Sequence, residues 1–140
     1  MARILLFFLS STLLISFSGY SQKTIQTINY AGGDVYEGQI ENGLPNGIGK
    51  MTWISGSSYI GSWRNNFQNG HGTMIWETGD EYEGEWVMGV QNGNGKMTWK
   101  SGDYYEGKFK DGLLEGKGTM WFENGIVQKG KWKANQFIGK

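Results

Sequence analysis

The sequence Tyr82-Glu83-Gly84-Glu85-Trp86, followed after five residues by Asn92-Gly93-Asn94-Gly95-Lys96-Met97-Thr98-Trp99, decides the fold. In both segments, an apolar residue or glycine occupies every second position, which is the periodicity of a strand and not of a helix. The residues between and after the segments are rich in glycine and asparagine, which favour turns. We therefore expect two short strands joined as a hairpin.

This pattern recurs every 23 residues, because residues 22–140 align in rows of 23 without a gap. The first strands share three columns: Tyr36, Tyr59, Tyr82 and Tyr105; Gly38, Gly61, Gly84, Gly107 and Gly130; Ile40, Trp63, Trp86, Phe109 and Trp132. The second strands are expected to begin at Gly49, Gly72, Gly95 and Gly118 and to reach Trp53, Trp76, Trp99 and Phe122. The segment between the two strands, residues 41–47 in the first unit, is expected to be a loop.

Glycine supports this register most sharply. Of 24 glycines, 23 lie beyond residue 31, and 22 of these fall in five of the 23 columns. A flexible glycine-rich linker would scatter them. In one of these columns Asn66 and Asn135 replace glycine, and asparagine is the usual substitute where the backbone angle φ is positive.

Alternation gives the sheet one apolar face and one mostly polar face, the latter carrying residues such as Glu83 and Lys96. On the apolar face, glycine beside tyrosine and tryptophan leaves space for the rings of the next hairpin. The predicted structural core consists of Tyr36, Gly38, Tyr59, Gly61, Trp63, Trp76, Tyr82, Gly84, Trp86, Trp99, Tyr105, Gly107, Phe109 and Trp132. A sheet covered in this way needs no second layer, so we expect an all-β, elongated, single-layer antiparallel sheet of consecutive hairpins.

The spaced pattern Tyr82-Glu83-Gly84-Glu85-Trp86, Gly89, Gly93, Gly95 resembles the MORN repeat, whose core is Tyr-x-Gly-x-Trp followed by spaced glycines. The resemblance covers about residues 33–139. A half unit starts at about residue 26, full units at about 33, 56, 79 and 102, and a truncated unit spans 125–140 without its second strand. The resemblance implies an interaction module for scaffolding, protein association or contact with membrane lipids, with no catalysis by the repeats. Ile40 and Gln128 depart from the pattern, in the first and last units.

Residues 1–21 are typical of a cleavable signal peptide. Arg3 provides a short positive region, residues 4–17 form a mostly apolar run, and small residues follow. The apolar run has about 14 residues, fewer than the roughly 20 that span a bilayer. We predict cleavage after Ser21, with Ser18 as the alternative, and an exported repeat domain of residues 22–140 that begins at Gln22.

Composition excludes several classes of function. The chain has no cysteine, so disulfides and thiolate metal sites are ruled out. Residues 22–140 hold 12 basic and 13 acidic groups, which argues against nucleic acid as the partner. The single histidine, His71, cannot form an ordinary zinc site and is expected to fill a loop. The acidic run from Glu77 to Glu85 lacks a calcium loop and is expected to be a solvated strand face. We predict no enzyme activity and no cofactor.

The candidate binding surface consists of residues that break the repeat or concentrate charge. It comprises Tyr104, Trp121, Lys129, Lys131 and Lys133. Tyr104 and Trp121 should point to the polar face, where an exposed aromatic ring suits a contact residue. Residues 96–140 hold nine basic and five acidic groups, so the lysines could bind an anionic lipid or polymer, or could protect a sheet edge from aggregation. A protein partner or self-association is the leading expectation, and a sugar or choline-like ligand held by aromatic rows is the alternative.

Overall fold

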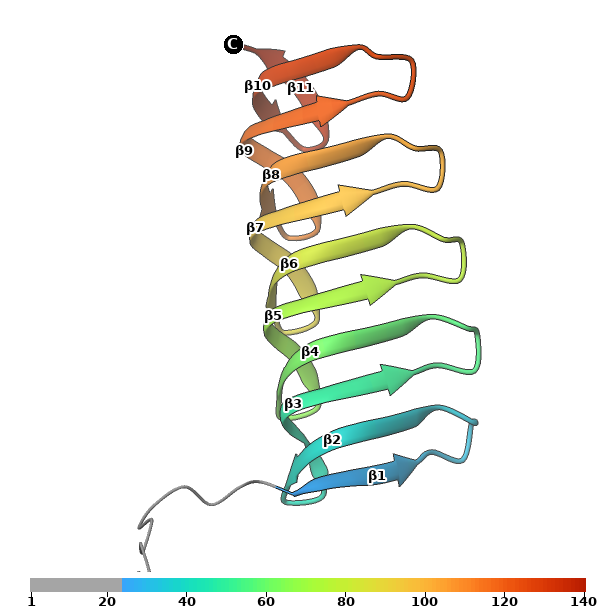
Figure 1. The fold of residues 1–140 in the computed structure, drawn as a ribbon. Helices are drawn as coiled ribbons and strands as arrows, with labels where there is room; N and C mark the ends of the chain where they lie inside the picture. Colours follow the sequence, from blue (N-terminus) through green and yellow to red (C-terminus); the bar gives the residue numbers. More distant parts are fainter. Residues whose placement is uncertain (1–23) are drawn as a thin grey trace, which may run out of the picture.

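The computed structural model describes residues 24–140, and the predicted signal peptide lies outside this range. Eleven strands follow one another along the chain (Figure 1). They are β1 (Ile25–Asn29), β2 (Val35–Glu41), β3 (Leu44–Thr52), β4 (Ser58–Arg64), β5 (Phe67–Ile75), β6 (Glu81–Val87), β7 (Val90–Thr98), β8 (Tyr104–Lys110), β9 (Leu113–Trp121), β10 (Val127–Lys133) and β11 (Gln136–Gly139). No helix in the described residues could cross a membrane.

All eleven strands belong to one antiparallel sheet in which each strand pairs with the next in sequence. The sheet is open and has a single layer, and the hairpins stack into an elongated array (Figure 1). The predicted fold class is therefore confirmed. A sheet of this kind consists of local contacts only, because each unit touches little besides its two neighbours.

Tight turns of two residues connect the two strands of each unit. Both turn residues have positive φ, as in Asn42 (52°) and Gly43 (77°), which is the signature of a type I′ turn and matches the twist of the flanking strands. Asn66 (70°) and Asn135 (67°) also have positive φ, as expected for replacements of glycine. The predicted loop over residues 41–47 was wrong, because β3 already begins at Leu44.

The misplaced loop is a bulged part of the strand pair. In the first unit Gly38 pairs with Gly49 and Ile40 pairs with Pro45, so Gln39 alone stands opposite residues 46–48. The Gln39 side chain fills the gap, since its Oε1 accepts the backbone N–H of Ile48 at 2.9 Å. A bulge bends the strand that carries it. The same shift recurs in the next three units, so the whole sheet is bent along one line, and the ribbons curl at the left of Figure 1.

Wider turns connect one unit to the next, and side chains tie these turns together. Asp80 Oδ1 accepts the backbone N–H of Lys100 at 2.9 Å, and Asp103 Oδ1 accepts that of Glu123 at 2.8 Å. Asp34 and Ser57 make the equivalent bonds to the turns that follow them. The hydrogen bond from Lys100, together with that from the Thr78 hydroxyl, lowers the pKa of the Asp80 carboxyl. Each turn thus anchors the equivalent turn of the next unit.

A continuous row of glycines lies along the line of the bend. Cross-strand pairing joins Gly38, Gly49, Gly61, Gly72, Gly84, Gly95, Gly107, Gly118 and Gly130. A Cβ on Gly49 would overlap the hydroxyl and ring of Tyr36, and a Cβ on Gly72 would overlap those of Tyr59. The tyrosine rings therefore lie directly on glycine backbone, at a distance that no other residue permits.

The inside of the bend is filled by a ladder of aromatic rings. Neighbouring rings meet edge to face with centroids 4.9–5.4 Å apart, as at Tyr59 and Trp63 (5.1 Å) and at Tyr59 and Trp86 (5.3 Å). The ladder runs Tyr36, Trp63, Tyr59, Trp86, Tyr82, Phe109, Tyr105, Trp132, Phe137. Such pairs add about 0.5–1.5 kcal/mol each beyond the burial of their area. This ladder is the core of the protein.

The polar atoms of the aromatic ladder form hydrogen bonds with the backbone. The hydroxyl of Tyr59 donates to the carbonyl of Ser62 at 3.1 Å, and Trp63 Nε1 donates to the carbonyl of Gly49 at 3.1 Å. Tyr36, Tyr82 and Tyr105 bond in the same way to the residue at each bulge. Burial raises the pKa of Tyr36 and Tyr59 to about 12 and also raises the pKa of Tyr82 and Tyr105.

The remaining predicted core residues lie elsewhere. Trp76 and Trp99 are half-buried at the wide turns, where they pack against the core without joining the ring ladder. The last unit is also more complete than expected. Its second strand was predicted to be missing, but β11 forms four residues of it and pairs with Lys131–Lys133 of β10. Phe137 on β11 extends the ladder by contacting Trp132 at 5.3 Å.

We predict that Gly72→Ala lowers the free energy of unfolding by about 1–3 kcal/mol, because the new methyl group overpacks against the buried Tyr59 ring. The matched control is Gly32→Ala, since a Cβ at Gly32 has no atom within 4 Å and its φ is not positive. The control should change stability by less than about 0.5 kcal/mol. Urea unfolding followed by tryptophan fluorescence measures both, and equal effects of the two variants would contradict the assigned role of the glycine row.

We predict that alkali destabilises the fold from about pH 10 upward. The pKa of Tyr36 and Tyr59 is raised to about 12 in the folded state, so their contribution is complete below the unfolded pKa and is lost as the pH rises through the folded value. Urea midpoints between pH 8 and pH 12 measure the loss, and Tyr59→Phe should reduce the pH dependence. Ionisation of all tyrosines near pH 10 in the folded protein, seen by absorbance, would disprove this prediction.

Candidate functional site

The aromatic face that suggested a binding surface is closed to ligands at its tyrosines. Tyr36, Tyr59, Tyr82 and Tyr105 each have 0% of their surface exposed. They lie inside the bend, between the sheet and the neighbouring tryptophan or phenylalanine rings. The tyrosines therefore cannot contact a partner, and on this face only half-buried residues such as Trp99, which lines a hollow with Met97 and Met120, remain accessible.

On the outer face, two aromatic side chains form a patch at the C-terminal end of the array. Tyr104 and Trp121 stand directly opposite each other on β8 and β9, and their rings stack with centroids 4.7 Å apart and planes 11° apart. Val127 follows on β10, opposite Trp121, and is 53% exposed. We call Tyr104, Trp121 and Val127 the outer aromatic patch. Their neighbours along the strands, such as Tyr105 and Met120, are buried, so alternation directs the patch outward.

A lysine from the preceding hairpin covers one side of this patch. Lys96 Nζ lies 4.9 Å from the centre of the Tyr104 ring, which is the geometry of a cation–π contact. The same Nζ lies 3.5 Å from Glu106 Oε1. Lys96 is thus held in place by two contacts and fixes the Tyr104 ring. Sequence inspection did not select Lys96, although the register of the hairpins places it beside Glu106.

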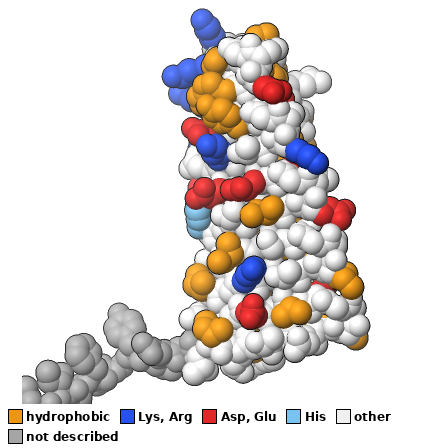
Figure 2. Space-filling view, turned by 45° about the vertical axis from the view of Figure 1, so that its right-hand side comes forward, with side chains coloured by type: hydrophobic (Ala, Val, Ile, Leu, Met, Phe, Trp, Pro, Cys, Tyr) orange, Lys and Arg blue, Asp and Glu red, His pale blue; other side chains and the backbone are white. Residues whose placement is uncertain are grey.

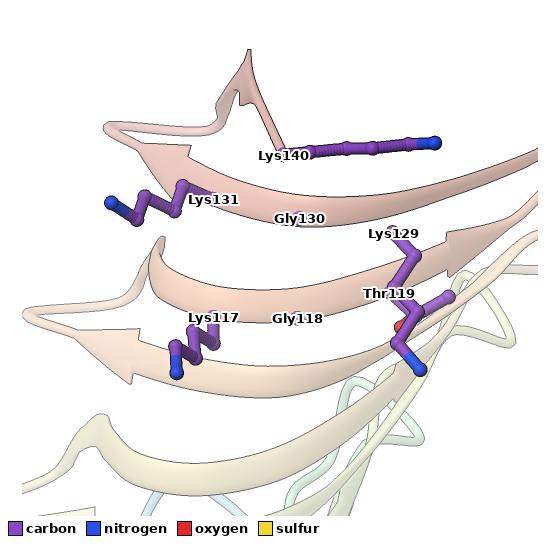
Figure 3. Close-up of a pocket in the computed structure, with 7 residues that line it drawn as sticks. All are labelled: Lys117, Gly118, Thr119, Lys129, Gly130, Lys131 and Lys140. Carbon is purple, nitrogen blue, oxygen red and sulfur yellow. The ribbon is translucent and has the colours of Figure 1, made fainter.

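Next to the patch, lysines surround a shallow hollow of about 330 Å³ on β9 and β10 (Figure 3). We call it the lysine hollow. It is lined by Lys117, Gly118, Thr119, Lys129, Gly130, Lys131 and Lys140. Figure 3 shows Lys117 and Lys131 on one side of the two glycines and Lys129 on the other, with the amino groups at the rim. The floor of the hollow is the backbone at Gly118 and Gly130, since strand alternation directs these two positions to the opposite face, toward Tyr105 and Phe137. The lysine stems form its apolar walls.

The lysine charges around the hollow are close together. Lys117 and Lys131 stand directly opposite each other across β9 and β10, an arrangement that destabilises a sheet. Within residues 24–140, none of the four lysines of the hollow forms an ion pair. An anionic group bound here would relieve this repulsion. Figure 2 shows lysines and apolar side chains close together at the C-terminal end of the molecule.

The structure brings together most, but not all, of the predicted binding residues. Tyr104 joins Trp121, and Lys129 joins Lys131. Lys133 does not line the hollow, because it ends β10 opposite Gln136. Lys117 and Lys140 belong to the C-terminal cluster of lysines that the sequence indicated as a possible anionic-surface patch, although they were not among the five residues of the candidate binding surface. The signal for Lys117 is its place opposite Lys131, which follows once the second strand of the hairpin is known to start at Leu113.

His71 and the acidic residues lie on the same outer face. His71 was expected in a loop, but it is an exposed residue of β5 opposite Glu85, since the second strand starts at Phe67. Glu81, Glu83 and Glu85 are exposed along β6, as the alternation of that strand requires. In the described part of the chain, no group of three histidine, aspartate or glutamate side chains is arranged to hold a metal ion. The outer face is thus acidic at β6 and basic at β9 and β10.

Comparison with known proteins identifies the repeat. The family model described as MORN repeat matches four consecutive segments, residues 36–58, 59–81, 82–104 and 105–127. These segments cover more than half of the 140 residues and have the 23-residue period of the hairpins. No curated protein matches the chain. The tyrosine at the start of each matched segment is the ring that lies on the glycine row. The chain belongs to the MORN repeat family.

Proposed function

We propose that this protein is an exported, non-enzymatic scaffold that binds an acidic protein surface through the outer face of β8, β9 and β10. MORN repeats suggest a module that binds protein or membrane. The observation that carries the proposal is the outer aromatic patch lying beside the lysine hollow. Tryptophan and tyrosine dominate the energetics of many protein interfaces, and lysines around them attract a partner of opposite charge.

The stacked pair favours a protein partner over a membrane surface. Trp121 and Tyr104 lie flat against each other, and Lys96 covers the Tyr104 ring. Rings packed in this way are a preorganised contact surface, which lowers the entropy cost of binding a shaped partner. Both rings are half-buried, so they offer less apolar surface to a bilayer than freely exposed rings would. A membrane is kept as an alternative outcome of the test below.

Catalysis and small-ligand binding have weaker support. The charged groups of the outer face are exposed lysines and glutamates on a solvated sheet, without the enclosed pocket that general acid–base chemistry uses. Of the tryptophan and tyrosine rows that could have held a sugar or a choline-like group, the tyrosines are fully buried. Trp99 and Phe122 do line a hollow of about 350 Å³ near Asp80 and Asp103, but both carboxylates already accept backbone hydrogen bonds.

Export is part of the proposal and has its own test. We predict that the protein isolated from the envelope or medium of its producing cell begins at Gln22, because residues 1–21 have the composition of a signal peptide. Mass spectrometry of the intact protein measures the N-terminus. A start at Gly19 would move the cleavage site to Ser18, while recovery of the chain with Met1 from the cell interior would refute export.

We predict that the triple variant Trp121→Ser, Lys129→Gln, Lys131→Gln loses its acidic partner. Removing the ring and two charges should weaken binding at least about tenfold, since a buried aromatic anchor alone contributes about 2 kcal/mol or more. The measurement is affinity capture with the immobilised protein at several salt concentrations, followed by titration of the captured partner.

The matched control removes comparable groups from elsewhere in the array. It is the triple variant Ile60→Ser, Lys50→Gln, Lys100→Gln, which removes one exposed apolar side chain and two exposed lysines. The control should retain the partner. Equal retention by both variants would refute the proposed surface. Salt-sensitive pelleting of the wild type with vesicles that contain about 30% phosphatidylserine, without any captured protein, would replace the protein partner by an anionic membrane.

A further inference from the structure

The two ends of the sheet are unfinished in complementary ways. β1 pairs with β2 and with no other described strand. At the other end, β11 covers only Lys131–Lys133 of β10, so Val127–Gly130 pair with β9 alone. Both ends therefore present backbone N–H and C=O groups without strand partners among residues 24–140. Free edges of this kind are templates for pairing with another strand.

When β1 and β11 are aligned with the repeat, they correspond to the two parts of one second strand of a unit. The complete second strands, β3, β5, β7 and β9, each have nine residues. With the period of 23, β11 occupies the positions of Leu44–Gly47, the first four residues of β3. β1 occupies the positions of residues 48–52, the last five. From Ile25 to Gly139 the chain thus consists of whole repeat periods, with no part of a unit left over.

We propose that copies of this protein associate head to tail, with β1 of one copy completing the last unit of the next. β1 of the second copy pairs antiparallel with Val127–Gly130 and continues β11. The register follows from β2 and β3, where Glu37 stands opposite Lys50 and Gly38 opposite Gly49. Lys129 then faces Thr27 of the second copy, and Gly130 faces Gln26. Lys140 holds the position equivalent to Ile25, so the new pairing covers Gln26–Asn29.

The column that holds tyrosine in the complete units is different at the two ends that would meet. In β3, the position of Gln26 is held by Gly49, because the Tyr36 hydroxyl lies on it. In β10, Gln128 stands in the column that holds tyrosine in the preceding units. β10 has no tyrosine ring in this column, and the place beside Gly130 is held by the Gly139 carbonyl and the Phe137 ring. Gly139 and Lys140 therefore have to move aside when Gln26 of a second copy pairs with Gly130.

Charge favours this joint over the pairing of two β10 ends. β10 carries Lys129, Lys131 and Lys133, so two β10 edges would place lysines next to lysines. β1 has no charged residue between Ile25 and Asn29. A head-to-tail joint is heterologous, and it translates each copy by whole repeat units, so it continues the array without closing a ring. The joint and the proposed partner site share residues, since Lys129 and Gly130 line the lysine hollow and also pair with β1 of the second copy. Association is therefore measured on the purified protein alone, without any acidic partner, so that the two proposals are tested separately.

The first test is a charge placed on β1. Thr27→Lys puts a lysine opposite Lys129 of the next copy, whereas within its own chain it faces Glu37, which already has Lys50 on its other side. The matched control is Thr73→Lys, since Thr73 holds the same column within the array and faces Glu83. Sedimentation of the full purified protein, with its N-terminus determined by mass, measures association over a wide concentration range.

We predict that the mass of the wild type rises with concentration, that Thr27→Lys weakens association at least about tenfold, and that Thr73→Lys leaves it unchanged. The double variant Thr27→Lys, Lys129→Glu should restore association, because opposite charges then face each other across the joint. A wild type that stays monomeric up to about 1 mM, or equal weakening by both single variants, would overturn the inference.

The second test identifies which ends meet. Directly opposed residues of antiparallel strands have Cα atoms about 4.5–5.5 Å apart, within the range of a disulfide. A mixture of Thr27→Cys protein and Lys129→Cys protein should therefore form mixed dimers on mild oxidation, in excess over dimers of either variant with itself. Dominant dimers of one variant with itself would show that identical ends pair, and would refute the head-to-tail joint.

Discussion

The contact between a tyrosine ring and a glycine backbone governs the whole molecule. Each ring lies over two glycines that face each other across neighbouring strands, and a Cβ at either glycine would overlap it. The ring can lie there because the strand pair bulges and bends, and the hydroxyl is fixed by the carbonyl at the bulge. The tryptophan of the next unit then closes the other side of the ring. Sheet curvature, core packing and the stacking of units are thus consequences of one contact that recurs from unit to unit.

Much of the fold follows from sequence columns because this contact is local. The tyrosine, glycine and tryptophan columns predicted the hairpins, their order and the single layer. The replacement of glycine by Asn66 predicted a positive φ, which the structure confirms. The second strand was misjudged because a bulged strand rich in glycine and asparagine has the composition of a loop. His71 was placed wrongly for the same reason, and β11 was missed because four residues are too few to show a period.

Less of the candidate site than of the fold could be predicted from the sequence. Alternation alone directed Tyr104 and Trp121 outward, but their stacking depends on the cross-strand register. The opposition of Lys117 and Lys131 requires the true start of β9, which the loop assignment hid. The contact between Lys96 and the Tyr104 ring depends on side-chain conformations, which a sequence period does not predict. Alignment of the repeats predicts the face of the sheet on which a side chain lies. Its neighbour on the next strand can be predicted only when the register of both strands is known.

The hydrogen bonds between successive wide turns have a mechanical consequence. On one side of the array Asp80 holds the turn that follows, and on the other side the backbone N–H of Gly89 bonds to the carbonyl of Gln68 in the preceding unit. Hydrogen bonds between neighbouring units on both sides of the array oppose its bending in either direction. Its length is then counted in whole units, so gain or loss of one repeat changes the span and leaves stiffness and shape intact. A chain built in this way can serve as a spacer of adjustable reach.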